Sequence, residues 1–284
     1  MQSRNPVFAR NDGFNGRSAS AYPGQTDPST WQTGSPTGAP AGYGSTPTAT
    51  DQGRMTVDSV VQKTAISLLL VFAAAVATWA FIGPIDADNP DNLAKAYGLA
   101  LGGALLGLVL SLVNSFKKVI SPPLVLAFAV VEGVFVGAFS KVITIYVGGD
   151  VSIVYQAILG TVGAFAGTLA VYKFFNIKVT DKFRRGVTAA VFGFVGLALL
   201  NFALSFFGLD FGFRNMGIMG LIVGIAAVVL GVLMLILDFD YVERGVAAGL
   251  PERESWRAAF GLTVTLVWLY IEILRILAIL RGSD

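Results

Sequence analysis

Acidic residues end or interrupt some of the most apolar stretches of this 284-residue chain. The segment LDFDYVERG (237–245) follows more than twenty residues without a formal charge, and Glu132 and Glu272 lie inside two other apolar runs. A carboxylate at bilayer depth is costly unless it is paired, hydrated or protonated, so such acids are candidates for function. A proton shared between two buried carboxylates makes a pH-sensitive latch, because like charges repel when the proton leaves.

Helical spacing separates the acids of LDFDYVERG. At about 100° per residue, Asp238 and Asp240 face opposite sides of a helix. Asp240, Glu243 and Arg244 share one face at steps of three and four residues, so we interpret them as a solvated helix end where they pair with one another. Asp238 lies next to the apolar part of the run. It either points into the protein or simply reaches water at the helix end.

The helix that contains Glu272 also carries Arg275 three residues later. The two side chains can form an intrahelical ion pair, which lowers the cost of burying both. This pair is either structural or part of a gate. Glu132 lies about 15 Å into its own apolar run and has no Lys or Arg within a turn. Only a neighbouring helix or water can satisfy its carboxylate.

The composition indicates which elements position these acids. Hydrophobic residues make up 54% of the chain and charged residues 13%, and the mean hydropathy is +0.68, whereas soluble domains are about 25% charged. The apolar runs are continuous, not alternating, which favours helices over a barrel. Their lengths approach the roughly 20 residues that cross a bilayer. We therefore predict an all-α integral membrane protein in which residues 54–284 form a bundle of seven transmembrane helices. The runs are 64–82, 96–113, 122–140, 151–172, 187–207, 216–237 and 257–280.

Residues 1–53 differ in composition from the rest of the chain. They hold six of the eleven prolines among Gly, Ser, Thr, Gln and Asn, and they show no apolar periodicity. Such a segment cannot form a core, so we predict a disordered tail. Its scattered aromatic residues leave room for a partner-binding motif.

The missing residue types exclude several kinds of chemistry. The chain has no Cys and no His, which excludes thiol nucleophiles, Cys/His zinc sites and imidazole acid–base catalysis. Neither an HExxH motif nor the Gly-rich paired-Asp signature of an aspartyl protease is present. The net charge of +2 does not indicate nucleic-acid binding. We expect a protein that is not an enzyme and has no resident cofactor.

Loop charges predict the orientation in the membrane, and small residues predict close helix packing. With a cytoplasmic N-terminus, the inner segments carry twelve Lys and Arg residues and the outer segments four. This asymmetry predicts a cytoplasmic N-terminus and a C-terminus outside. Glycines spaced three and four residues apart in 98–107 and 160–167 let helix backbones approach closely in lipid.

Several motifs resemble one membrane-protein family. LDFDYVE followed by VWLYIEILRIL (267–277) is similar to the last two helices of the Bax inhibitor-1 family, also called transmembrane Bax inhibitor motif or YccA-like proteins. VEGVFVGAFS (131–140) resembles the family's E-G-x-x-x-G-x-x-S, and NPVF, VVQKTAISLLL and EILRIL resemble its actinobacterial-type branch. The resemblance implies a pH-sensing acid pair on the sixth and seventh helices that gates a calcium leak in the bacterial inner membrane.

By motif, Asp238 takes the sixth-helix position of that pair and Glu272 the seventh. Ca²⁺ would then be a transported ion, with both carboxylates as candidate ligands. Two departures from the family pattern concern this pair. The seventh-helix acid is Glu where the family has Asp, and Arg275 replaces a neutral Asn. A built-in cation at Arg275 either disfavours Ca²⁺ or serves as a basic partner for the acids.

The spacing along the chain leaves two pairings open. In a simple hairpin that turns near residue 250, Asp238 faces about residue 262, and Glu272 lies roughly 15 Å further along. The two acids meet only if GVAAGLPERESW (245–256) forms an interfacial or re-entrant segment. Otherwise Glu132 is the better partner for Glu272.

Two functions remain in competition. The first is a proton-gated leak channel or exchanger for Ca²⁺ or another cation, which uses the buried carboxylates. The alternative is a non-conducting regulator that docks on other membrane proteins, such as a membrane-bound protease. In both cases the surroundings are the lipid bilayer of the cell membrane. The sequence does not predict an oligomeric state.

Overall fold

The computed structural model describes residues 53–85, 89–175, 177–205, 207–208 and 215–282. These residues form seven long helices, each long and apolar enough to cross a membrane, which confirms the predicted all-α membrane bundle. Apart from Gly53, the tail predicted to be disordered (1–53) lies outside the described residues. The elements are α1 (Val57–Ile82), α2 (Asp91–Phe116), α3 (Pro122–Tyr146), α4 (Ser152–Phe174), α5 (Asp181–Ser205), α6 (Ile218–Ala247), η3 (Glu252–Glu254) and α7 (Ser255–Gly282).

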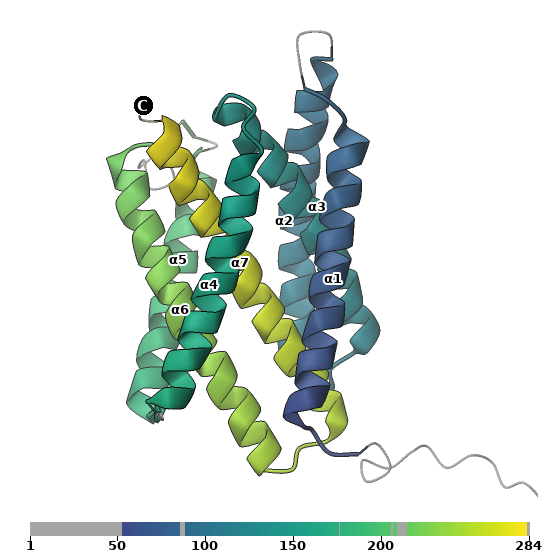
Figure 1. The fold of residues 1–284 in the computed structure, drawn as a ribbon, viewed down its shortest axis with the longest axis vertical. Helices are drawn as coiled ribbons and strands as arrows, with labels where there is room; N and C mark the ends of the chain where they lie inside the picture. The colour runs from purple at the N-terminus through teal and green to yellow at the C-terminus, as the bar shows by residue number, and fades with distance from the viewer. Residues whose placement is uncertain (1–52, 86–88, 176, 206, 209–214, 283–284) are drawn as a thin grey trace, which may run out of the picture. The chain divides into compact units, whose positions relative to one another are not determined.

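Successive helices alternate in direction through the bundle (Figure 1). Helices α1, α3, α5 and α7 begin at one end, drawn at the bottom, and α2, α4 and α6 begin at the other. We call the first end the basic end, because the α2–α3 and α4–α5 connections there contain Lys117, Lys118 and Lys178. The last helix finishes at the opposite end of the bundle (Figure 1).

Helix α7 is the central element of the bundle. Within its spanning segment 72% of residues are buried, whereas the value for α5 is 11%. It packs against α1, α3, α4 and α6. Glu272 and Arg275 therefore lie on the helix with the least access to lipid, while α5 exposes most of its apolar side chains.

The closest helix approach joins α1 and α3. A Cβ atom on Gly133 would lie 2.4 Å from the carbonyl oxygen of Val71, and one on Gly137 would lie 2.4 Å from that of Ala75. No larger residue fits at these two positions without moving a backbone. The glycines of α3 thus set the α1–α3 distance.

The close approach predicted for the other two Gly-rich segments holds in part. In α2, a Cβ on Gly103 would lie 3.0 Å from the backbone of Phe135, as expected, but Gly98 and Gly102 have open space around them. In α4, Gly160 lies close to Ile273, but Gly163 and Gly167 have open space around them. Periodicity alone could not tell a packed glycine face from a lipid-facing one.

The connection between α6 and α7 is a short hairpin. Its length determines how far apart Asp238 of α6 and Glu272 of α7 lie along the two helices. Helix α6 continues to Ala247, Gly249 turns the chain at a φ of +61°, and α7 begins at Ser255. The residues before α1 lie along this connection. Met55 N–H donates to the carbonyl of Leu250 at 2.7 Å, and the Met55 side chain is 2% exposed. The re-entrant alternative for 245–256 is therefore wrong.

Candidate ionisable site on α6 and α7

Asp238 points from α6 towards α7. Thr265 donates its hydroxyl to Asp238 Oδ2 at 2.7 Å, and Oδ1 lies 3.2 Å from where a Cβ on Gly261 would be. Thr265 is 1% exposed, so the contact is inside the bundle. Of the two interpretations of Asp238, the structure favours the one in which its carboxylate points inward. The hairpin estimate, which placed it opposite residue 262, is confirmed.

Glu272 and Arg275 form the predicted intrahelical ion pair. Arg275 donates from Nε at 3.0 Å and from Nη2 at 2.6 Å to the same oxygen, Glu272 Oε2. The residues are 3% and 2% exposed. The guanidinium lies against α6 where Gly224 leaves room, since a Cβ there would be 3.3 Å from Nη2. In the described part of the chain, the buried Nη1 of Arg275 has no hydrogen-bond partner.

Asp238 and Glu272 do not share a proton directly. Thr265, which contacts Asp238, lies seven residues before Glu272, a distance of about 10 Å along a helix. The two carboxylates thus lie at different positions along the axis of α7. Of the two pairings that the sequence left open, direct contact between Asp238 and Glu272 is not what the structure shows, because the short hairpin fixes this offset.

Glu132 is not the partner of Glu272 either. Its Oε2 lies 2.8 Å from the position of a Cβ on Gly107, so it faces α2. The hydroxyls of Ser140 and Tyr270, 2.7 Å apart, set the register of α3 and α7, which begin at the same end. Glu132 precedes Ser140 by eight residues and Glu272 follows Tyr270 by two, which separates the two acids by about 15 Å along the bundle.

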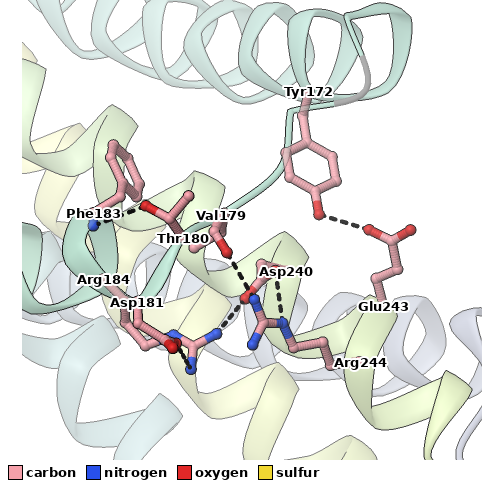
Figure 2. Close-up of polar contacts among 9 residues, drawn as sticks. All are labelled: Tyr172, Val179, Thr180, Asp181, Phe183, Arg184, Asp240, Glu243 and Arg244. Atoms are coloured by element: carbon pink, nitrogen blue, oxygen red, sulfur yellow. Dashed lines mark hydrogen bonds and ion pairs between the residues drawn. The ribbon is translucent and has the colours of Figure 1, made fainter.

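Asp240 is the buried member of an ion cluster between α5 and α6 (Figure 2). It is 7% exposed and accepts hydrogen bonds from Arg184 Nη2 at 2.8 Å and Arg244 Nε at 2.9 Å. Arg244 Nη2 also donates to the carbonyl of Val179 at 2.8 Å. The pairing with Arg244 is as predicted, but the solvated position is wrong, because α5 and the α4–α5 connection cover Asp240.

Glu243 faces a different neighbour. It accepts a hydrogen bond from the hydroxyl of Tyr172 in α4 at 2.6 Å (Figure 2), and it is exposed. Its predicted pairing with Asp240 and Arg244 is not what the structure shows. The basic end of α6 is thus attached to α4 through Glu243 and to α5 through Asp240.

A search of curated proteins gives no match for this chain. The sequence profile of the family described as Bax inhibitor 1 like matches residues 5–282, nearly the whole chain. The chain belongs to this family. Seven apolar helices and this membership make it a multi-pass membrane protein.

In this Bax inhibitor 1 like chain, the four residues of VEGVFVGAFS that match the family motif E-G-x-x-x-G-x-x-S each contact a neighbouring helix. Glu132 faces α2, Gly133 and Gly137 contact the backbone of α1, and the hydroxyl of Ser140 bonds Tyr270 of α7. The motif is thus the place where α3 meets three neighbouring helices. Helix packing therefore explains why the motif has Gly and Ser at these positions. Of its four residues, only Glu132 is a candidate for ionic chemistry.

The sequence prediction missed a polar cluster at the end opposite the basic end. Arg281, near the end of α7, pairs with Asp150 in the α3–α4 connection and bonds Ser152 and Gln156. Hydrogen bonds from Ser152 lower the pKa of Asp150 below its usual 3.8, and the charge of Arg281 adds to the effect. Asp150 and Ser152 form an i, i+2 polar turn before α4, a signal that could have been noticed.

Proposed function

We propose that this protein is a pH-sensitive cation leak channel or exchanger in which Asp238 is the main gating group. The observation that supports this most is the environment of its carboxylate. Asp238 lies on a membrane-spanning helix, and in the described part of the chain its hydrogen-bond partner is a hydroxyl and not a cation. An acid without a fixed counter-ion at such a position is a candidate for binding a proton or a mobile cation.

The hydroxyl of Thr265 suits a proton-exchanging carboxylate. A hydroxyl can donate to an ionised carboxylate or accept from a protonated one, so the α6–α7 contact persists in both states. The protonated state is neutral and favours a dry, closed contact. Loss of the proton leaves a negative charge that attracts water or a cation. The charge of Asp238, not the making or breaking of its bond, is the proposed switch.

Ca²⁺ is the proposed ion because hard cations prefer oxygen ligands and this chain offers oxygen without His or Cys. Among the described residues no three acids form a group that could hold a metal ion. A cation at Asp238 would be held by one carboxylate together with hydroxyl and carbonyl oxygens. Such a ligand set binds weakly, which suits passage better than storage.

Glu272 and Arg275 form a second buried polar contact, further along α7 than the Asp238–Thr265 hydrogen bond. The guanidinium already neutralises the carboxylate, so a cation at Glu272 must approach a fixed positive charge. Buried polar groups in proteins are nearly always satisfied, often by water. Within the described residues, the Nη1 of Arg275 is a buried donor without a hydrogen-bond partner. We assign the first cation contact to Asp238 and a gating role to the Glu272–Arg275 pair.

Ca²⁺ flux into proteoliposomes, measured across a pH series, tests this assignment. Asp238→Asn mimics the protonated state permanently, so we expect low flux that no longer changes with pH. Glu272→Gln should reduce the flux as well. Glu243→Gln is the matched control, because Glu243 is an exposed acid on the same helix. Wild-type flux in both Asp238→Asn and Glu272→Gln would refute the proposal.

A regulator that docks on other membrane proteins is the second candidate, and one contact favours it. The segment before α1 is fixed to the α6–α7 connection by Met55 and by a bond from Glu252 N–H to the carbonyl of Gly53 at 3.1 Å. The chain thus enters α1 beside the α6–α7 connection, so a pull on residue 53 acts on this connection. Deleting residues 1–52 leaves these contacts in place. A channel should keep its flux after this deletion, whereas a docking regulator should lose its effect.

A further inference from the structure

The first two turns of α1, the starts of α3 and α7, and the short helix η3 surround a recess at the basic end. It has a volume of about 330 Å³ and is lined by Lys63 of α1, Pro122 of α3, Glu252 and Arg253 of η3, and Trp256 of α7. We propose that this recess binds the phosphate of an anionic phospholipid headgroup. The proposal is independent of cation flux and concerns a different end of the helices from the Glu272–Arg275 pair.

Arg253 is the main candidate for holding the phosphate. Its Nε donates to the carbonyl of Ile120 at 2.8 Å, which fixes the plane of the guanidinium. The residue is exposed, and within the described part of the chain it forms no ion pair with a carboxylate. Its two terminal nitrogens remain for an anion, and a guanidinium can bind phosphate oxygens through two parallel hydrogen bonds.

Lys63 supports the recess from its inner side. Its Nζ lies 2.9 Å from Glu252 Oε1 and 3.1 Å from the carbonyl of Glu252. It also lies 5.7 Å from the ring centre of Trp256. The side chain is only 11% exposed, so its position is well defined. Glu252 offsets this one positive charge and leaves that of Arg253 uncompensated.

The surroundings of the recess are positively charged overall. Glu254 is paired with Arg257 at 2.7 Å, and Arg257 Nη2 donates to the carbonyl of Lys118 at 3.0 Å. This bond holds the α2–α3 connection beside the recess, where the side chains of Lys117 and Lys118 are exposed. Among the described residues, the nearby Glu252 and Glu254 are thus already used in ion pairs, whereas Arg253, Lys117 and Lys118 form none.

The position of the recess favours a lipid over a soluble phosphate. A helix of 26 residues such as α1 is about 39 Å long, longer than the roughly 30 Å hydrocarbon core. A helix of this length can extend its first turn beyond the core into the headgroup layer, the depth at which Trp is enriched. Anionic lipids are concentrated in that layer and attract clusters of Lys and Arg.

Thermal unfolding of the full chain in detergent–lipid micelles tests the proposal. The measured quantity is the rise in Tm when phosphatidylglycerol replaces phosphatidylcholine, compared for the wild type, Arg253→Gln and Lys173→Gln. Lys173 is an exposed cation in the last turn of α4, away from the recess. We expect a rise of several degrees for the wild type and Lys173→Gln, and less than half of that rise for Arg253→Gln. Because each variant is compared with itself, any intrinsic loss of stability cancels.

Three results would overturn the proposal. The first is no difference between the two lipids for the wild type. The second is an equal loss of the lipid effect in Arg253→Gln and Lys173→Gln, which would mean general charge attraction. The third comes from inorganic phosphate added to phosphatidylcholine micelles, where a rise as large as with phosphatidylglycerol would identify a soluble anion as the ligand.

Discussion

Replacing Asp240 by Asn should weaken the attachment of α5 to α6. Asp240 receives two charged hydrogen bonds, from Arg184 on α5 and from Arg244 on its own helix (Figure 2). Asn has almost the same shape but no charge, so the substitution tests the ion pairs and not the packing. Both guanidinium groups remain after the change, and each then lacks its carboxylate.

The exposure of the three side chains sets the expected magnitude. That of Asp240 is 10% exposed, whereas those of Arg184 and Arg244 are 40% and 51% exposed. Breaking a fully buried pair costs about 3–5 kcal/mol, and breaking an exposed one costs about 0–1 kcal/mol. The arginines can turn to water, so we expect an intermediate loss of about 2 kcal/mol. This corresponds to a fall in Tm of roughly 4–8 °C for a chain of this size.

The assay is thermal unfolding of the full chain in one detergent, with Asp181→Asn as the control. Asp181 contacts the same Arg184, but at 4.0 Å and with a side chain that is 81% exposed, so its loss should change Tm by less than about 2 °C. A double-mutant cycle with Arg184→Gln should give a coupling of about 1 kcal/mol between Asp240 and Arg184. Equal Tm values for Asp240→Asn and Asp181→Asn would refute the reasoning.

Three further outcomes are expected. Gly137→Ala should lower Tm by several degrees, because the added Cβ would lie 2.4 Å from the α1 backbone. Gly163→Ala on α4 is the control and should leave Tm unchanged, because Gly163 has open space around it. Equal effects of the two substitutions would show that the α1–α3 contact is not tight. The Tm difference between the wild type and Asp150→Asn should stay constant from pH 8 to pH 5 and shrink once the pH falls below about 4, because a lowered folded-state pKa gives stability that is lost only as the pH falls through it. A loss already at pH 5 would contradict the lowered pKa. The chain has no cysteine of its own, so single introduced cysteines can report the orientation. With a cytoplasmic N-terminus, a membrane-impermeant thiol reagent should label Val151→Cys in intact cells and Lys118→Cys only after permeabilisation. The reverse pattern would mean that the N-terminus is outside.

The fold was predictable because each of the seven helices corresponds to a continuous apolar run in the sequence. The register of α6 against α7 matches one of the two alternatives that the sequence left open, the simple hairpin near residue 250 that places Asp238 opposite residue 262. The intrahelical pair of Glu272 and Arg275 follows from spacing alone. Contacts that depend on only one helix, or on one short hairpin, can therefore be derived from the sequence.

Contacts between helices distant in the chain could not be derived in this way. Arg184 reaches Asp240 across 56 residues, and nothing in the Lys- and Arg-rich start of α5 distinguishes it from its neighbours. The prediction placed Asp240 in water because the sequence of α6 alone does not show that α5 covers it. Similarly, Glu132 lies against α2 because the glycines of α3 face α1, an arrangement that depends on the rotation of packed helices.

The acids of α6 and α7 differ in how their charge is compensated, and this difference bears on mechanism. Asp240 has two arginines and Glu272 has Arg275 at 2.6 Å, so each of these two carboxylates faces a fixed positive charge. Asp238 contacts the hydroxyl of Thr265, which accepts either protonation state. We therefore rank Asp238 first among these three acids as the proposed gating group, since its hydrogen bond within the described residues comes from a neutral hydroxyl. If Asp238→Asn left a pH-dependent flux intact while Arg275→Gln abolished its pH dependence, the compensated pair on α7 would be the sensor and this ranking would be wrong.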